Sequence, residues 1–262
     1  MAQRTEARDV ASTPVLAGRR AVVTGASSGI GRAIALAFAE AGADVVVTYH
    51  RSAAAAESVA AEACGHGVAA STIQADLAES RDIDRLVEQS FERLGGIDIW
   101  VNNAGQDILT GGGARLPARE QLDRLIAVDL RGTVLCCWQV AERMRSGGGG
   151  VILNMSWDRA LNGSRGREAE LFSAVKSGVQ GFSRSLALTV APTVRVNVLA
   201  PGWIATAFAA AMSDEERRRI AARTPLGRWG EPEDVARAAL FLASPAAAFL
   251  TGVVLPINGG AA

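Results

Sequence analysis

The chain has 262 residues, of which 49% are hydrophobic and 21% charged, and its 27 basic residues balance 27 acidic ones. This length suits one α/β domain. The balanced charge argues against a nucleic-acid-binding protein, which usually carries a basic excess. No apolar run approaches the roughly 18 residues that span a bilayer, and the first residues contain no apolar signal region. Three cysteines without metal-type spacing predict reduced, buried thiols in a cytoplasmic protein with no metal site.

Short apolar runs alternate with amphipathic stretches along most of the chain. We expect residues 1–17 to form a flexible tail and residues 18–262 to form one domain. Strands that alternate with helices pair in parallel through right-handed crossovers. The pattern therefore predicts a Rossmann-like doubly wound sheet of about seven strands inside three α/β/α layers. The predicted strands are 21–24, 44–48, 67–74, 97–102, 151–156, 194–200 and 253–258, and the predicted helices are 29–41, 80–94, 120–146, 169–190 and 232–243.

A glycine-rich turn, TGASSGIG at 24–31, joins the first strand directly to the first helix. Glycines let the backbone turn tightly, and the free N–H groups at the helix start attract a pyrophosphate. The strand before and the helix after make this reading stronger than the alternative of a purely structural turn. We therefore predict a dinucleotide site in which the phosphate contacts come from Gly25, Ser27, Ser28, Gly29, Ile30 and Gly31.

Further segments follow this turn in a characteristic order: ADL at 75–77, NNAG at 102–105, APGWIAT at 200–206 and TGVVLPINGG at 251–260. With them, residues 19–260 resemble the short-chain dehydrogenase/reductase family. The resemblance implies that Asp76 accepts a hydrogen bond from the adenine amino group and that Thr206 holds the nicotinamide carboxamide. The remaining cofactor contacts that it implies are Leu77, Asn103, Ala104, Gly105, Lys176, Pro201, Gly202 and Ile204.

The choice between NADP(H) and NAD(H) depends on the end of the second strand. An acidic residue there would bind the ribose 2′-hydroxyl of NAD and repel a 2′-phosphate. The sequence instead has Tyr49, His50 and Arg51. An arginine can pair with a phosphate, so we favour NADP(H); the alternative is that Arg51 is a solvated residue that opens a helix.

The segment AELFSAVKSG at 169–178 departs from the family pattern. Members that reduce ketones use a tyrosine as proton donor, a lysine four residues later, a serine after the fifth strand and an asparagine in the preceding helix. Here Lys176 is retained, but Phe172 stands at the tyrosine, Trp157 at the serine and Asp129 at the asparagine. The stretch between Trp157 and Phe172 is also about two residues longer than the family pattern. The resemblance thus implies altered proton handling.

Three neighbouring polar residues are candidates for the altered chemistry. Asp129 either pairs with Lys176, directly or through water, or replaces the asparagine in a structural role. Asp158 either acts as a replacement acid or caps the loop or meets an arginine of 165–168. Ser156 is the surviving hydroxyl, but a one-residue shift along a strand reverses the side to which a side chain points. Trp157, Phe172, Trp203 and the segment 204–212 predict an apolar pocket, unless they only pack in the core or between subunits.

Three functions are compatible with these residues. The first is an NADP(H)-dependent oxidoreductase with an atypical active site, acting on a hydrophobic carbonyl, enone or imine. The second is a cofactor-binding protein without redox turnover. The third is a dehydratase, cyclase or isomerase built on the same scaffold. The partners that we expect are a small hydrophobic substrate and copies of the same chain, as a dimer or tetramer formed through helices 120–146 and 169–190.

Overall fold

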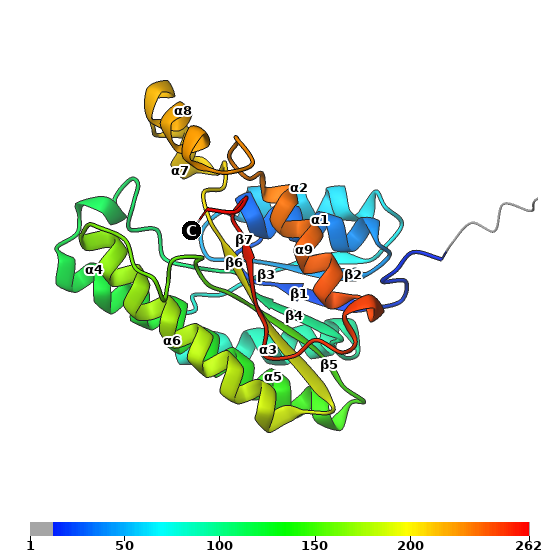
Figure 1. Ribbon diagram of the computed structural model, residues 1–262. Coiled ribbons are helices and arrows are strands. Elements are labelled where there is room, and N and C mark those ends of the chain that lie inside the picture. Colours follow the sequence, from blue (N-terminus) through cyan, green and yellow to red (C-terminus); the bar gives the residue numbers. More distant parts are fainter. Residues whose placement is uncertain (1–12, 262) are drawn as a thin grey trace, which may run out of the picture.

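A computed structural model describes residues 13–261, and a twisted parallel sheet lies at its centre (Figure 1). Within these residues seven strands pair in parallel in the order β3-β2-β1-β4-β5-β6-β7. The order reverses at β1, which has β2 on one side and β4 on the other. The predicted Rossmann-like doubly wound fold is therefore confirmed. The strands are β1 (Arg20–Val23), β2 (Asp44–Tyr49), β3 (Ala70–Gln74), β4 (Ile99–Asn102), β5 (Gly150–Met155), β6 (Val194–Pro201) and β7 (Val254–Ile257).

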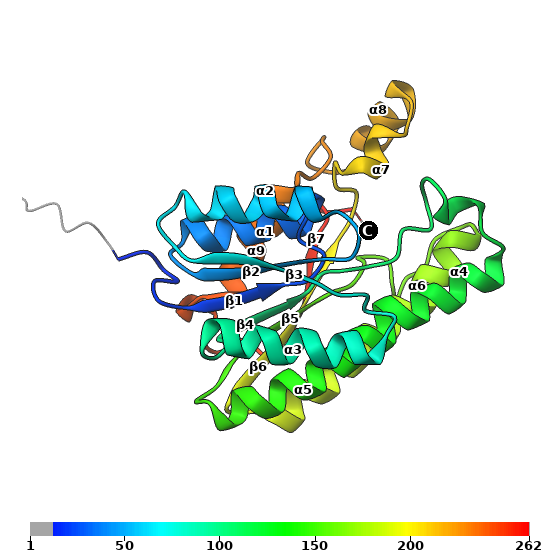
Figure 2. The same ribbon diagram turned by 180° about the vertical axis from the view of Figure 1, so that it is seen from behind.

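Helices cover both faces of the sheet and give the fold its three layers (Figures 1 and 2). One face packs against α1 (Gly29–Glu40), α2 (Ala53–Cys64) and α9 (Pro232–Ala243). The other face packs against α3 (Ser80–Leu94), α5 (Thr133–Ser146) and α6 (Arg167–Val190). Side chains alternate between the faces of a strand. Consequently Val23 lies in the first apolar cluster and its neighbour Val22 in the second.

Several elements differ from those predicted from the sequence. The single helix expected at 120–146 consists of α4 (Ala118–Leu125), a π-helical segment (Ile126–Gly132) and α5. The helix α2 was missed because alanines, rather than large apolar residues, form much of its buried face. The third strand begins at residue 70 instead of 67, since Gly67 adopts a positive φ of 83° that a strand does not allow.

Two short helices project from one end of the molecule, α7 (Ala207–Ala210) and α8 (Asp214–Arg223) (Figure 1). A capping box between Ser213 and Glu216 starts α8, in which each residue satisfies a backbone N–H of the other. From the sequence, residues 204–212 were expected only to contribute apolar surface to a pocket. The structure places them at the base of this projection.

The start of the described chain lies against the body of the domain. The expected tail at 1–17 falls mostly outside the described residues. Of its last part, Leu16 is buried and donates a backbone hydrogen bond of 2.8 Å to Ala41. The prediction of three buried thiols is wrong for Cys64, which is exposed at the end of α2. Among residues 13–261, no helix is long and apolar enough to cross a membrane.

Candidate cofactor and active site

The candidate site residues lie where the strands β1, β4, β5 and β6 end. Because the strands are parallel, their carboxyl ends meet at one edge of the sheet. The glycine-rich turn follows β1, the NNAG segment ends β4, and residues 156–158 and 201–206 surround the ends of β5 and β6. Ligands of open α/β sheets bind at such an edge, where the strand order reverses. Motifs separated by more than 170 residues in sequence are thus brought to the same place.

The glycine-rich turn is closed so tightly that side chains would not fit at two of its positions. Gly25 has a φ of 62°, and a Cβ there would lie 2.8 Å from the Cα of Ala104. A Cβ on Gly31 would collide with the amide nitrogen of Asn103 and the carbonyl oxygen of Gly25. Gly29 faces Thr206, whose methyl group would lie 3.6 Å from an added Cβ. The turn after β1 and the segment after β6 therefore approach each other.

Two threonines that sequence analysis overlooked brace this turn. The hydroxyl oxygen of Thr24 accepts hydrogen bonds from the backbone N–H groups of Asn103 (2.9 Å) and Ala104 (3.0 Å). The hydroxyl oxygen of Thr48 accepts one from Gly25 N–H at 3.2 Å. The Asn103 side chain donates in return to the carbonyl oxygen of Thr24 at 2.9 Å. Thr24 had a local signal, its position between a buried strand and the glycine motif, whereas the contact of Thr48 depends on the pairing of β1 with β2.

The start of α1 is suited to hold an anion. Ser28 occupies the N-cap position, but its side chain forms no capping hydrogen bond. The first N–H groups of a helix lack partners within the helix and carry the positive end of the helix dipole. Combined with the close approach of the glycine backbone, this arrangement fits a pyrophosphate. Ser27, Ser28 and Ile30 lie on this turn and are at least partly accessible.

The expected adenosine end of the site lies at β2 and β3. Asp76 follows β3, and its carboxylate contacts the Nε2 atom of His50 at 3.3 Å. The other carboxylate oxygen accepts from the backbone N–H of Ala78 at 3.0 Å. Leu77 is buried, and Arg51 is exposed just before α2. His50, which had no role in the sequence prediction, thus contacts the predicted adenine ligand Asp76 and directly precedes the predicted phosphate ligand Arg51 in the sequence.

Lys176 and Asp129 form a buried ion pair. The lysine Nζ lies 2.9 Å from Asp129 Oδ1, and the two side chains are only 9% and 2% exposed. Lys176 Nζ also donates to the Met155 carbonyl oxygen at 3.3 Å. The other oxygen of Asp129 accepts from the backbone N–H of Gln106 at 2.8 Å. The π-helical segment positions Asp129, so this carboxylate joins three elements, the segment before α5, the loop after β4 and α6.

The Ser156 hydroxyl is directed at α6. It donates to the backbone carbonyl oxygen of Lys176 at 3.1 Å and accepts from the Gln180 side chain at 3.0 Å. Gln180 lies one helical turn after Lys176 and was not found by sequence analysis. Its own carbonyl oxygen is buried without a hydrogen-bond partner among residues 13–261. Ser156 therefore ties the end of β5 to the helix that carries Lys176.

Aromatic rings line both sides of this edge of the sheet. The rings of Trp157 and Phe172 are 6.3 Å apart and tilted by 56°. Phe172 also packs against an apolar cluster that includes Leu125 and Val175. On the other side, Trp203 stacks on Phe208 at 5.9 Å and contacts Trp229 edge-on at 5.6 Å. Apart from the buried Trp229 these rings are only half-buried, as expected for residues that line a site rather than fill a core.

Asp158 is held between the ends of β6 and β7. The Asn258 side chain donates to its Oδ2 at 3.1 Å, and the Asp158 backbone N–H donates to the Pro201 carbonyl oxygen at 3.1 Å. A Cβ on Gly202 would lie 3.1 Å from the same carboxylate oxygen. The other oxygen is buried and has no partner among the described residues. Burial raises the pKa of the Asp158 carboxyl, and the Asn258 hydrogen bond opposes that rise.

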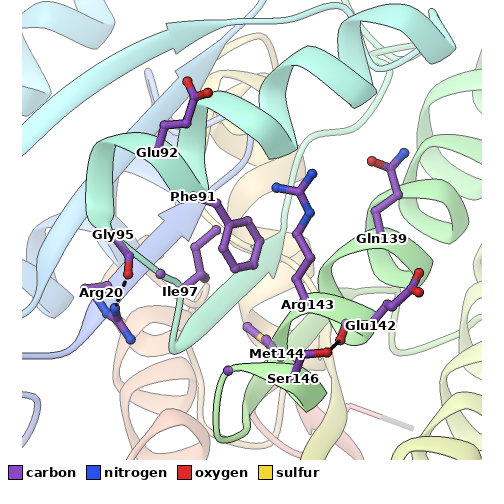
Figure 3. Close-up of a pocket in the computed structure, with 12 residues that line it drawn as sticks. Arg20, Phe91, Glu92, Gly95, Ile97, Gln139, Glu142, Arg143, Met144 and Ser146 are labelled. Carbon is purple, nitrogen blue, oxygen red and sulfur yellow. Dashed lines mark hydrogen bonds between the residues drawn. The ribbon is translucent and has the colours of Figure 1, made fainter.

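A cavity of about 960 Å³ lies at the opposite ends of the strands (Figure 3). It is lined by residues from the ends of α3 and α5, among them Phe91 and Arg143, and by Arg20 at the start of β1. The guanidinium of Arg143 lies over the Phe91 ring at 5.1 Å. None of the predicted site residues lines this cavity. Within residues 13–261, no cluster of three or more histidine, cysteine, aspartate or glutamate residues could hold a metal ion.

Comparisons with known proteins identify relatives that match almost the whole chain. A family model described as enoyl-(acyl carrier protein) reductase matches residues 25–262. A 3-oxoacyl-[acyl-carrier-protein] reductase of Synechocystis sp. is 38% identical over 249 residues, covering 94% of this chain and 97% of the relative. The chain belongs to the short-chain dehydrogenase/reductase family. The 3-oxoacyl-[acyl-carrier-protein] reductase FabG of Aquifex aeolicus, another member, is also 38% identical and covers 94% of this chain and 98% of its own.

Solved structures of the family share the fold over its whole length. A 7α-hydroxysteroid dehydrogenase complexed with NADH and 7-oxo glycochenodeoxycholic acid superposes with a TM-score of 0.87 and is 32% identical, covering 96% of this chain and 97% of its own. A short-chain dehydrogenase from Burkholderia cenocepacia in complex with NADP gives a TM-score of 0.86 at 32% identity, with coverages of 94% and 99%. These are nicotinamide cofactor complexes of proteins with this fold.

Proposed function

We propose that the protein is an NADP(H)-dependent oxidoreductase with an atypical active site that acts on a hydrophobic carbonyl, enone or imine. The observation that carries this proposal is that the closed glycine turn after β1 and Lys176, which contacts the end of β5, lie at the same edge of the sheet. Relatives solved with NADH and NADP support a nicotinamide cofactor. The bound nicotinamide would supply a hydride, so the chain must orient the cofactor and the substrate.

Different residues of this chain would orient different parts of the cofactor. The helix start at Ser28–Ile30 binds the pyrophosphate, and Asp76 receives the adenine. Lys176, with one ammonium hydrogen directed at Asp129 and one at Met155, has a third left for the nicotinamide ribose. Thr206 follows the turn at Pro201–Ile204 and faces Gly29. Its approach to the glycine turn supports the assignment of Thr206 to the carboxamide at the reacting end of the cofactor.

A second candidate function follows from the phenylalanine that stands where the family has its proton-donating tyrosine. Phe172 has no proton to give, which favours a cofactor-binding protein without redox turnover. The two proposals are separated by mixing purified protein with NADPH and a panel of ketones, enones and imines while calorimetry measures NADPH binding. Hydride transfer to any substrate supports the oxidoreductase, and binding without transfer across the panel supports the second candidate. Product formation without NADPH consumption would instead indicate a dehydratase, cyclase or isomerase.

The glycine turn gives a direct test of the cofactor site. Gly31→Ala is expected to weaken NADPH binding at least about tenfold, equivalent to about 1.4 kcal/mol, because the new Cβ collides with Asn103 and Gly25. Gly181→Ala is the matched control, since nothing lies within 4 Å of an added Cβ on this exposed helical glycine. That control should stabilise α6 by roughly 0.5–1 kcal/mol. Unchanged NADPH affinity in folded Gly31→Ala protein would contradict the placement of the site.

Arg51 carries the preference for NADP(H). Its guanidinium is exposed before α2 and has no carboxylate partner among the described ion pairs. Arg51→Ala is expected to weaken NADPH binding about tenfold while leaving NADH binding nearly unchanged, because a charge-assisted hydrogen bond to the 2′-phosphate is lost. Calorimetric titration with each cofactor measures the ratio. Equal losses for NADPH and NADH would show that Arg51 does not read the phosphate.

Two exposed apolar residues support a homo-oligomer formed through the long helices. Trp138 on α5 is 58% exposed, and Leu188 on α6 is 83% exposed. Trp138 meets Phe182 of α6 edge-on at 6.3 Å, so the two helices form one apolar surface. Such surfaces are uncommon on monomers. We therefore propose that the protein forms a dimer or tetramer through this surface. A cytoplasmic location is also part of the proposal.

A further inference from the structure

The charge of the lysine in the site is neutralised inside the protein. Asp129 lies 2.9 Å from Lys176 Nζ, and the pair is almost wholly buried. Hydride addition to a neutral carbonyl creates an alkoxide, which needs a proton or a positive charge nearby. Here the positive charge of Lys176 is already balanced by a carboxylate. The site therefore offers little to stabilise a developing negative charge.

The hydroxyl groups that could deliver a proton are absent or engaged elsewhere. Phe172 and Trp157 offer a hydrocarbon ring and an indole, neither of which is an acid at ordinary pH. The Ser156 hydroxyl donates to the Lys176 carbonyl oxygen on the core side of α6. A substrate that needs no proton after hydride addition would therefore suit this site better than a ketone or an enone, which both end as oxyanions.

The remaining surface is aromatic and attracts cations. Trp157 follows β5 and Phe172 lies on α6, while Trp203 follows β6 and Phe208 lies on α7. The face of an indole or phenyl ring is negative and attracts a cation that lies within about 6 Å of its centroid. The carboxyl group of Asp158 adds an acidic group beside Gly202, the residue before Trp203.

We propose that the substrate is a flat, apolar iminium cation held by these aromatic rings. This inference narrows the proposed function and rests on it. The iminium carbon accepts a hydride, which is one proton with two electrons, and the C=N π pair becomes the lone pair of a neutral amine. The same two electrons are lost by the nicotinamide, which takes over the positive charge. No side chain gives or takes a proton, and the net charge of the site does not change.

Binding without turnover tests the recognition of the cation. With the protein saturated by NADPH, which cannot reduce a quaternary ammonium ion, calorimetry compares N,N-dimethyl-1,2,3,4-tetrahydroisoquinolinium with its carbon isostere, 2,2-dimethyl-1,2,3,4-tetrahydronaphthalene. We expect the cation to bind about tenfold more tightly. Trp203→Leu should reduce that ratio to nearly one, because it replaces an aromatic face with an aliphatic side chain of no quadrupole. Phe91→Leu is the matched control, since Phe91 lies in the distant cavity, and it should keep the ratio.

Turnover separates this inference from the proposed function. NADPH oxidation is followed with N-methyl-3,4-dihydroisoquinolinium, with 1-tetralone, a neutral bicyclic ketone of similar size, and with the enone benzylideneacetone. Reduction of the iminium at least tenfold faster than either neutral compound supports the inference. Faster reduction of a neutral compound, or no preference of the binding site for the cation, overturns the inference and leaves the oxidoreductase intact. Failure to reduce any of the three, with the cation bound or not, overturns the inference together with this form of the proposed function.

Discussion

Asp129→Ala is expected to lower the free energy of unfolding by about 3–5 kcal/mol, because it leaves the ammonium group of Lys176 buried without a counter-charge. The same change removes the acceptor for the Gln106 N–H, which lies 2.8 Å from the carboxylate. The first loss falls on the junction between the π-helical segment and α6, and the second on its junction with the loop after β4. Urea unfolding followed by circular dichroism measures the effect, with a lower midpoint and an unchanged slope as the expected result.

Two control variants test whether the expected loss of stability comes from the burial of this ion pair or would follow from breaking any ion pair. Glu120→Ala breaks the pair with Arg124, which is equally short at 2.7 Å but about 45% exposed on each side. That loss should be below about 1 kcal/mol. The double variant Asp129→Leu with Lys176→Met removes both charges and should recover most of the loss. An Asp129→Ala loss no larger than that of Glu120→Ala would mean that Lys176 is solvated and that the charge of the site is not neutralised.

The cofactor half of the site could be predicted from the sequence because its constraints are local. Gly25 and Gly31 are needed by a backbone turn that a few consecutive residues define, and the strand and helix beside it follow from short-range periodicity. The assignments of Asp76 and Thr206 came instead from the family resemblance, and the structure has them after β3 and β6 at the same edge of the sheet. Thr48 was not predicted, because its contact with Gly25 depends on the pairing of β1 with β2 and not on its own neighbours.

The proton-handling half could not be placed from sequence alone. Whether Asp129 reaches Lys176 directly depends on the π-helical segment, whose extra residue per turn rotates the side chain and leaves no pattern of apolar residues. The direction of Ser156 depends on where β5 ends, and one residue decides whether it faces α6 or the opposite layer. The stacking of Trp203 on Phe208 arises from the turn into α7, a helix too short for periodicity to reveal.

Phe172→Tyr is expected to confer reduction of 1-tetralone with NADPH at a rate at least about 10²-fold above that of the parent protein, the usual contribution of a general acid. The new hydroxyl would lie one helical turn from Lys176, on the same face of α6. The ring keeps its contact with Trp157, because tyrosine adds only one atom to a half-buried phenylalanine. Turnover should fall as the pH rises through about 10, where a phenol loses its proton.

Two companion variants identify which group prevents the reduction of 1-tetralone in the parent protein. Phe172→Leu removes the ring without adding a hydroxyl and should leave 1-tetralone unreduced. The double variant Phe172→Tyr with Trp157→Ser also supplies a hydroxyl at the position after Ser156 and should exceed the single variant. If neither tyrosine variant reduces 1-tetralone while calorimetry shows unchanged NADPH binding, the missing phenol is not what prevents ketone reduction. The neutralised charge of Lys176 would then be the dominant barrier, and Asp129→Asn in the double variant, which removes that counter-charge, should release it.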